Sequence, residues 1–543
     1  MQGCRWSCRS ILLSQAGAMT TGQKFVDGAA ARLLEALKSR SSKEERFRRL
    51  TETNGDSDLK KRSVRGFTTS LVGEGIDFVL RVGSMSILAR MLLPEYFGLL
   101  TMVMVVTAVV DRLKDLGLTV VTIQRKTITH EEVSTLFWIN AAGGLAMALI
   151  VAACAYPLAL FYQEPRLIPI TLAMATTFIW TSLTVQHSAL LNRQMKYAHL
   201  AAIQISTNAL SLAVAIVLAW AGAGYWALIA REALRTLFIA AGVWMCFPWV
   251  PSLPSRKARI TSMLSFGGDL TAFNLVYFVS SGVDKILIGR LFGAASLGMY
   301  RQSSQLAVLP ASQLVYPVNN VAQSVLSRLQ SDPERYRRSY SKLLTALCAI
   351  VMPLMLFLAV FARETIFVVL GEKWLPATNI LWIMAMTSFI EPAISTVGAV
   401  LLTSGKSRRY LITGATSSLV IVASFVAGIP WGAEGVAFGH LVATYLSLVP
   451  FLWWSFRDTP ITLRLFAAAV SRPLIASVLT GALLYNLKAT AIFDRALPML
   501  LFGAALMVPL YFSFWLLIPG GRSAMTAVWK DLMSAFRESK GAS

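Results

Sequence analysis

Long apolar stretches alternate with short polar gaps along most of this chain, and fourteen stretches can be distinguished. Each is long enough to form the helix of about twenty residues that crosses the hydrocarbon core of a membrane. The pattern therefore predicts an all-α polytopic membrane protein with about fourteen transmembrane helices. The stretches lie near residues 67–91, 97–116, 133–161, 167–190, 198–221, 224–247, 264–289, 297–323, 342–362, 377–403, 410–430, 434–456, 470–488 and 496–518.

Positive charge falls mainly in every second gap between these stretches. Most of the 50 Lys and Arg residues lie in the N-terminal tail, in alternate gaps and in the C-terminal tail. Because the cytoplasmic loops of membrane proteins are enriched in Lys and Arg, the pattern predicts that both termini are cytoplasmic. The gaps on the opposite side contain Arg90, Arg166, Arg290, Arg363, Lys373, Lys488 and Arg495.

A short motif recurs at an offset of 200 residues. The segment Arg90–Gly98 aligns without gaps with Arg290–Gly298, and each lies at the exit from the first helix of a set of six. A weaker match at an offset of 210 pairs Gly222 with Gly432. Because six is an even number, both sets enter the membrane in the same orientation. We therefore expect two parallel repeated lobes around a central cavity.

The repeat divides the chain into predicted regions. Segment 248–262 is basic and contains three prolines, as expected of a linker between lobes. The last two helices fall outside the repeat and are predicted to be peripheral. The regions are a cytoplasmic basic tail (1–64), an N-terminal six-helix lobe (65–247), the cytoplasmic linker (248–262), a C-terminal six-helix lobe (263–457), helices thirteen and fourteen (458–518) and a cytoplasmic tail (519–543).

Composition narrows the function further. With 55% hydrophobic residues, 14% charged residues and a mean hydropathy of +0.60, the chain is not an ordinary soluble domain. The net charge of +22 is scattered over short gaps, which favours contact with anionic phospholipids over nucleic-acid binding. The four His residues are far apart in the sequence, and no pair of cysteines has further zinc-ligating residues near it. No metal site is therefore expected.

Several ionisable side chains fall inside the predicted spans, where charge is costly and usually functional. In the first helix Ser70, Glu74, Asp77, Arg81 and Ser84 recur at spacings that place them on one face. Arg81 is a candidate for binding an anionic group of a substrate, and Glu74 or Asp77 for binding a driving H⁺ or Na⁺. The structural alternative, in which these charges only neutralise one another and join helices, stays open.

Other helices add polar residues that predict a wide cationic cavity. No catalytic constellation accompanies them, and the segment 404–407 lacks the first glycine of a P-loop because position 400 is valine. Interhelical hydrogen bonding is the structural alternative for each residue. The further cavity cations are Arg231, Arg235, Lys285 and Arg301, and the further polar candidates are Asp269, Asn274, Tyr277, Asp284, Gln305 and Asn319.

Two motifs resemble a known family. The segments Asp284–Gly293 and Leu297–Tyr300 look like the signature at helices seven and eight of bacterial polysaccharide exporters. The segments Ala89–Leu99 and Asp115–Leu118 look like its counterpart in the first half. These exporters are the lipid-linked oligosaccharide flippases of the multidrug/oligosaccharidyl-lipid/polysaccharide exporter superfamily. The resemblance covers residues 65–520, and the long tail before it has no counterpart.

The resemblance implies a substrate, a mechanism and a place. Members move an undecaprenyl-pyrophosphate-linked repeat unit of lipopolysaccharide or exopolysaccharide across the bacterial inner membrane by alternating access, without enzymatic chemistry. It further implies H⁺ or Na⁺ coupling in place of a bound cofactor, and polysaccharide polymerase and other assembly proteins as partners. Under it, the five cavity cations are candidates for the pyrophosphate or acidic sugars, and Glu74 and Asp77 for ion coupling. Arg90 and Arg290 lie near the outer interface, where anchoring to lipid phosphates is a further role.

Two other functions compete with this interpretation. The first is a multidrug exporter of the same superfamily driven by H⁺ or Na⁺, which would favour an acidic and aromatic cavity. Charge alone does not separate it, because Glu74, Asp77, Glu232, Asp269, Asp284 and Glu391 also lie in the spans. The second is a membrane-embedded polysaccharide polymerase, which would need catalytic residues on the outer face.

Overall fold

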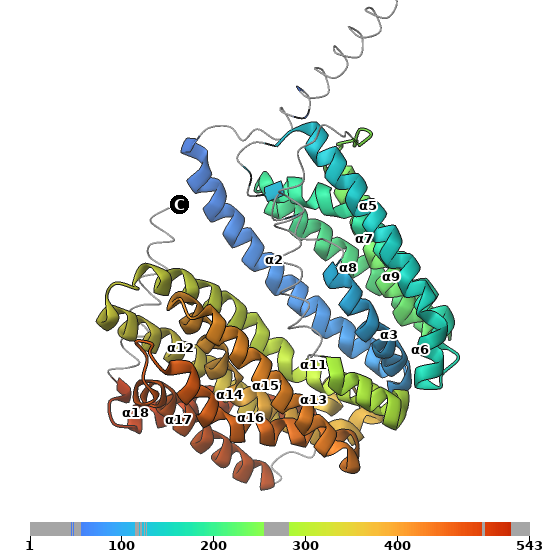
Figure 1. Cartoon of the computed structure of the whole chain (residues 1–543). Helices are drawn as coiled ribbons and strands as arrows, with labels where there is room; N and C mark the ends of the chain where they lie inside the picture. Colours follow the sequence, from blue (N-terminus) through green and yellow to red (C-terminus); the bar gives the residue numbers. More distant parts are fainter. Residues whose placement is uncertain are drawn as a thin grey trace, which may run out of the picture.

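The protein is a bundle of long helices (Figure 1). The computed structural model describes residues 56–113, 128–254, 282–490 and 495–522, together with positions 45, 47, 119, 122, 123 and 125. Every regular element within those residues is helical. Each predicted apolar stretch in these ranges falls mainly on one helix, apart from 133–161, which covers α5 and α6. The stretch 264–289 lies mostly outside the described residues.

The first group of helices contains the elements before the predicted linker. In this group α2 packs against α8, α8 against α9, α9 against α7, and α7 against α5. The helices are α2 (Asp56–Met91), α3 (Pro94–Leu113), α5 (His130–Ala153), α6 (Ala155–Tyr162), α7 (Leu167–Arg193), α8 (Tyr197–Trp220) and α9 (Trp226–Cys246).

The second group contains the elements after the linker. Its centre is α14, which packs against α11, α12 and α16, while α17 packs on α12 and α18 on α17. The elements are α11 (Val283–Arg328), α12 (Pro333–Val360), α13 (Ala362–Val369), η2 (Glu372–Ala377), α14 (Thr378–Thr403), α15 (Ser407–Gly428), η3 (Ile429–Trp431), α16 (Gly432–Phe456), α17 (Leu463–Ala489) and α18 (Ala496–Leu517).

Helix α11 is two helices joined at Gly293. This residue has φ 80° and ψ 179°, a conformation that only glycine adopts without strain. The break separates the ends of the two predicted stretches 264–289 and 297–323. Gly293 therefore lies in the predicted gap 290–296 between two apolar stretches.

Similar turns recur 210 residues apart. Gly222, between α8 and α9, has φ 79°, and Gly432, at the start of α16, has φ 73°. Met195, between α7 and α8, has φ 56°, and Gly405, between α14 and α15, has φ 71°. The weaker of the two sequence matches thus coincides with a repeated backbone conformation, and the Met195 and Gly405 turns extend it to a second pair that the sequence comparison did not identify.

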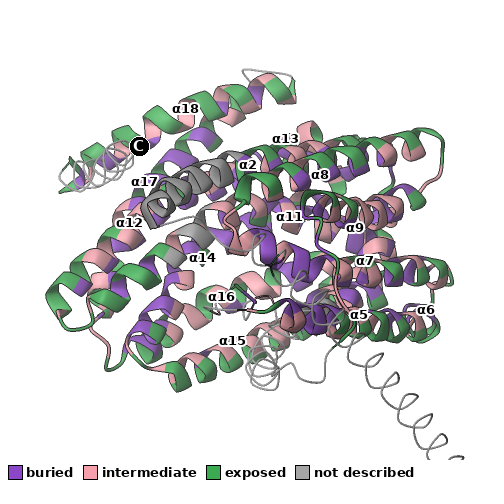
Figure 2. Ribbon diagram, turned by 90° about the horizontal axis from the view of Figure 1, so that it is seen from above, coloured by how far each residue is buried: buried purple, intermediate pink, exposed green. Residues whose placement is uncertain are grey.

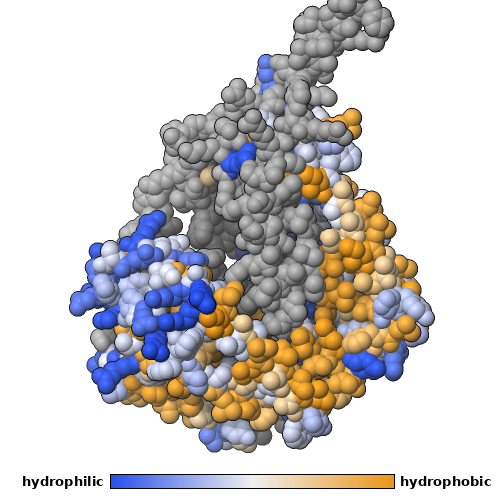
Figure 3. All heavy atoms as spheres, in the orientation of Figure 1, coloured by the Kyte–Doolittle hydropathy of each residue, from blue (hydrophilic) through white to orange (hydrophobic). Residues whose placement is uncertain are grey.

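The surface is that of a protein embedded in a membrane. Among the described residues, eight helical segments are long and apolar enough to cross a membrane by length and composition. Large apolar side chains such as Leu149, Leu446 and Leu501 are more than half exposed, and exposed positions recur along the outer helices (Figure 2). Apolar side chains form a broad orange area on the face shown in Figure 3. So much exposed apolar surface requires contact with lipid.

The segment that follows α9 is held against α5. Residues 248–254 contain no helix. The Ser252 hydroxyl lies 2.7 Å from His130 Nε2, and the Ser252 carbonyl accepts a hydrogen bond of 2.8 Å from Trp138. The described half of the predicted linker therefore belongs to the surface of the first group, and residues 255–262 lie outside the described residues. The domain boundaries themselves stay predictions.

Candidate functional site

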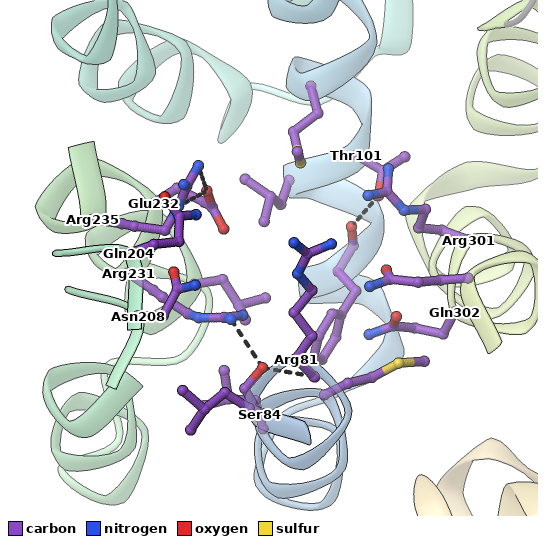
Figure 4. A pocket seen from close by; sticks show the side chains of 18 residues that line it. Arg81, Ser84, Thr101, Gln204, Asn208, Arg231, Glu232, Arg235, Arg301 and Gln302 are labelled. Atoms are coloured by element: carbon purple, nitrogen blue, oxygen red, sulfur yellow. Dashed lines mark hydrogen bonds and ion pairs between the residues drawn. The ribbon is translucent and has the colours of Figure 1, made fainter. Parts of the chain in front are cut away.

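A cavity of about 340 Å³ lies where the first group faces α11. Helices α2, α3, α8 and α9 of the first group form most of its wall, and α11 contributes the rest (Figure 4). The lining residues are Leu80, Arg81, Ser84, Met85, Leu88, Phe97, Leu100, Thr101, Met104, Gln204, Asn208, Leu228, Arg231, Glu232, Arg235, Arg301, Gln302 and Gln305.

Arg81 projects into the cavity from α2 (Figure 4). Its guanidinium Nε donates a 2.6 Å hydrogen bond to the carboxylate of Asp77, one helical turn earlier. The other carboxylate oxygen of Asp77 accepts a hydrogen bond from the Asn208 side chain of α8. Asp77 is 4% exposed, whereas the Arg81 side chain is 42% exposed. The buried carboxylate therefore orients a guanidinium that keeps free donors for a ligand.

Arg231 enters the cavity from α9. One terminal nitrogen donates a 2.9 Å hydrogen bond to the Ser84 hydroxyl of α2, and that hydroxyl donates to the Arg81 carbonyl. Its Nε atom is buried and, within the described residues, has no hydrogen-bond partner. An unpaired buried donor on a cation is costly. The arrangement is therefore suited to an anion that supplies the missing acceptor.

The remaining charges leave the cavity positive. Arg235 pairs with Glu232 one turn away on α9, at 3.3 Å. Arg301 lies across the cavity on α11, and Glu232 and Asp284 are the acidic groups whose charge acts on it (Figure 4). Among the described residues, the lining thus has four arginines and one acidic residue, Glu232. Fixed positive charge in a low-dielectric wall attracts an anionic group strongly.

The fifth predicted cation lies elsewhere. Lys285 does not line the cavity; its ammonium pairs with Asp284 at 3.2 Å. The Asp284 carboxylate also accepts a 2.9 Å hydrogen bond from Tyr300, which is 1% exposed. Asp284 and Lys285 therefore form a separate buried cluster in α11. The side-chain requirements of both charges are met there without a ligand.

The other predicted residues divide between three places. Gln305 lines the cavity, as predicted for a polar wall. Asn319 does not, although its Oδ1 atom is buried and has no hydrogen-bond partner in the described parts of the chain. Glu74 is exposed on α2 and lies outside the lining. Asp269, Asn274 and Tyr277 lie outside the described residues.

Sequence reasoning missed four polar residues of the wall. Gln204 and Asn208 lie one turn apart on α8, and two amide side chains at that spacing in a predicted span could have indicated a polar face. Gln302 adjoins Arg301 on α11, and Thr101 lies on α3 with its hydroxyl bonded to the Phe97 carbonyl. A threonine bonded within its own helix gives no sequence signal of a cavity position.

The cavity can bind a ligand that is anionic at one part and rich in hydroxyls at another. Guanidinium forks match the oxygens of phosphate groups, and Arg81, Arg231 and Arg301 approach the same space. The side-chain amides of Gln204, Gln302 and Gln305 can donate to and accept from hydroxyl groups. Within the described residues, no cluster of three or more His, Cys, Asp or Glu side chains is placed to hold a metal ion.

Comparison with known proteins identifies the family. The model of the polysaccharide biosynthesis protein family matches residues 87–379, which is more than half of the chain, so this protein belongs to that family. It is 25% identical over 400 residues to the lipopolysaccharide biosynthesis protein WzxC of Escherichia coli (strain K12), covering 72% of this chain and 80% of WzxC. It is 25% identical over 440 residues to the succinoglycan biosynthesis transport protein ExoT of Rhizobium meliloti (strain 1021), covering 77% and 85% of the two chains.

Solved structures show the same fold. The lipid II flippase MurJ in an inward closed conformation has a TM-score of 0.66 at 13% identity, over 86% of this chain and 99% of MurJ. An inward-facing multidrug resistance transporter of the MATE family has a TM-score of 0.54 at 13% identity, over 74% and 98%. At this identity the likeness concerns the fold alone. The chain is therefore a membrane protein with the helical fold of these transporters.

Proposed function

We propose that this protein moves a lipid-linked oligosaccharide, attached to a polyprenyl pyrophosphate, from the inner to the outer leaflet of the bacterial inner membrane. The family membership and the relatives that act in lipopolysaccharide and succinoglycan biosynthesis support a role in making a surface polysaccharide. Translocation changes no covalent bond, so the cavity needs only to bind and release its ligand. Binding sites without a nucleophile or a metal suffice for that task.

The observation that carries the proposal is the arginine cluster inside the membrane protein. Arg81 and Arg231 present donors to one cavity, and the buried Nε of Arg231 needs an acceptor. A pyrophosphate diester has two negative charges and several acceptor oxygens within the reach of two guanidinium groups. The amides of Gln204, Gln302 and Gln305 are the corresponding candidates for contacts with the first sugars.

The same proposal includes the transmembrane arrangement. Fourteen spans arise if α2, α3 and α9 cross the membrane, if α5 with α6 forms one span, if the predicted stretch 264–289 is one span that ends in α11, and if the part of α11 after Gly293 is another. The two helix groups then act as six-helix lobes that alternate access to the cavity, with α17 and α18 outside them. The basic gaps and both termini face the cytoplasm, where anionic phospholipids bind the cations.

Ion coupling and protein partners belong to the proposal as well. Glu74 is exposed on α2, and so is accessible to H⁺ or Na⁺. Asp77 is the buried partner of Arg81, so its protonation would release that arginine. A polysaccharide polymerase and other assembly proteins would consume the delivered oligosaccharide on the outer side.

The charge of the cavity disfavours a multidrug exporter. Four arginines against one acidic residue in the described part of the lining would repel the cationic compounds that such exporters bind. The same arginines would attract the anionic pyrophosphate of a lipid-linked sugar. The amides in the wall also suit hydroxyl groups better than flat apolar molecules.

Substitution of Arg231 tests the function directly. We expect Arg231→Ala to abolish surface polysaccharide and to cause lipid-linked oligosaccharide to accumulate on the cytoplasmic side, with Arg231→Lys retaining partial export. Arg335→Ala is the matched control, because the Arg335 side chain is 73% exposed on α12. Protein abundance in the membrane is measured alongside. Wild-type polysaccharide from Arg231→Ala at normal abundance would contradict the proposal.

A further inference from the structure

The two helix groups meet in a compact seam, formed by residues 89–98 of the first group and residues 289–298 of the second. These are the two copies of the repeated motif. Helices α3 and α11 make the most extensive contact between the groups, and α6 also contacts α11. In Figure 1, α3, α6, α11 and α13 gather at the same end of the molecule. The seam therefore consists of the motif that recurs at an offset of 200 residues.

The helices of the seam approach through matching glycines. A Cβ atom added at Gly98 would overlap the carbonyl oxygen of Ala294, and one added at Gly298 would overlap the carbonyl oxygen of Pro94. The two contacts are equivalent, because Pro94 and Ala294 occupy the same position of the two motif copies, as do Gly98 and Gly298. Close backbone approach at small residues is a favourable way to pack helices within a membrane. No larger side chain fits at either position while the seam stays closed.

The two motif arginines cross the seam in opposite directions. Arg90, at the end of α2, donates a hydrogen bond to the carbonyl of Val368, the penultimate residue of α13. Arg290, on α11, lies 5.9 Å from the ring centroid of Phe161, the penultimate residue of α6. Each arginine therefore reaches the last turn of the short helix of the opposite group. A cation there also interacts favourably with the carbonyl end of the helix.

Trp374 joins the seam to the cavity. Its side chain is fully buried, and its indole N–H donates a 2.9 Å hydrogen bond to the Ala89 carbonyl across the seam. The ring packs edge-to-face on Phe97, with centroids 5.3 Å apart. Phe97 in turn lines the cavity. The seam thus lies directly beyond the arginine cluster and separates it from that end of the molecule.

We infer that the seam is the closed outer gate of the transporter, with Arg90 and Arg290 as reciprocal latches rather than anchors for lipid phosphates. Exit to the outer leaflet then requires both glycine contacts and both arginine contacts to separate together, because they lie on the same pair of surfaces. Such a contact has two discrete states, packed or parted. The assignment of the seam to an exit path rests on the proposed function. The contacts that close the seam do not depend on any substrate.

Accessibility of the cavity to a reagent from outside the cell tests the gate. The variant Met104→Cys, in a background with the native cysteines replaced, provides a thiol in the cavity wall. Adding Gly98→Leu should increase its labelling by a membrane-impermeant maleimide about tenfold, because an overpacked contact destabilises the closed state. Gly143→Leu on α5 is the control, since a Cβ atom there meets no atom within 4 Å.

The latches are tested in the same assay. Arg90→Ala removes one hydrogen bond and Arg290→Ala one cation–π contact, so each should increase outside labelling by about threefold, and the double variant should exceed either. Neither substitution inserts bulk, so a folding failure of Gly98→Leu leaves this arm intact. Unchanged labelling in Arg90→Ala and Arg290→Ala at normal abundance would overturn the gate and favour lipid anchoring. The assay measures access to a thiol and not export of polysaccharide, so its failure is distinguishable from failure of the proposed function.

Discussion

The arginines of the cavity and those of the seam differ in whether protein groups satisfy them. In the cavity, Arg231 has a buried Nε without a partner in the described chain, and Arg81 is oriented by Asp77 with donors to spare. In the seam, Arg90 is bonded to the Val368 carbonyl and Arg290 lies on the ring of Phe161. The first pair is prepared for a ligand, and the second pair is satisfied by protein.

The difference comes from what surrounds each guanidinium. In the cavity, Arg81 and Arg231 are bonded mainly to side chains, namely Asp77 and the Ser84 hydroxyl. The seam brings backbone carbonyls close, since Gly98 and Gly298 allow the helices to approach. A cation near a free helix-end carbonyl acquires a protein partner, whereas a cation beside a hydroxyl and an amide retains unused donors. Removing groups from either region tests that contrast.

The largest effect is expected from the seam. Trp374→Ala removes a fully buried indole and should destabilise the protein by about 3 kcal/mol or more. Thermal unfolding in detergent measures it. Trp382→Ala is the control, because that side chain is 44% exposed on the neighbouring helix α14. Equal melting of the two variants would mean that the seam is not tightly packed.

The next effect concerns the orientation of Arg81. Asp77→Asn keeps the shape of the side chain but removes the negative charge, so export should fall about tenfold, equivalent to about 1.4 kcal/mol. Surface polysaccharide per transporter molecule measures it. Asn208→Ala, which removes the other contact to Asp77, should act in the same direction. If Asp77 instead binds the coupling ion, only Asp77→Asn will abolish the response to an imposed H⁺ or Na⁺ gradient.

A smaller effect is expected at Ser84. Its hydroxyl accepts a hydrogen bond from Arg231, and Ser84→Ala should cost about 1 kcal/mol of that orientation. The expected result is a rise of about fivefold in the concentration of pyrophosphate-linked ligand needed for half-saturation of the purified protein. Ser84→Thr, which retains a hydroxyl, should bind like the wild type. Identical binding by Ser84→Ala would show that Arg231 is positioned by other groups.

The smallest effect concerns the turn between α6 and α7. Arg166 donates a 2.7 Å hydrogen bond to Glu164 and also pairs with Glu95 on α3. The hydrogen bond from Arg166 lowers the pKa of the Glu164 carboxyl. A lowered pKa stabilises the fold above the ordinary carboxyl pKa, and the stabilisation is lost as pH falls through the folded-state value. Glu164→Gln should therefore lower the melting temperature slightly at neutral pH. The difference from wild type should shrink as the pH falls through the lowered folded-state pKa of Glu164, and a difference that grew in acid would contradict this sign.

The helices were predictable because their signal is local. A run of apolar residues long enough to span the hydrocarbon core has few alternatives to a helix, since unpaired backbone groups are too costly in lipid. The stretch 198–221, for example, became α8 at Tyr197–Trp220. The break at Gly293 and the turn glycines at 222 and 432 were likewise visible as interruptions of the pattern. Arg81, Arg231, Arg235 and Arg301 stood out as charges inside apolar runs, and they share a cavity.

Contacts between distant helices were not predictable in the same way. Lys285 and Arg301 were equivalent as intramembrane cations, but Lys285 pairs with its neighbour Asp284 while Arg301 faces the cavity. Gln204 gained its place in the wall only because α8 packs against α2 and α9. The reciprocal use of Arg90 and Arg290 required the approach of α3 to α11, which no single helix specifies.

The sequence by itself determined where the membrane helices lie and which charges they contain, because hydrophobic length and the cost of buried charge act within one segment. Tertiary structure decided which of those charges have spare donors and which are consumed by a carbonyl or a ring. That depends on distances between helices far apart in the chain. At Gly98 and Gly298 the distance is set by the absence of a side chain, and its consequence for Arg90 and Arg290 exists only once the two copies meet.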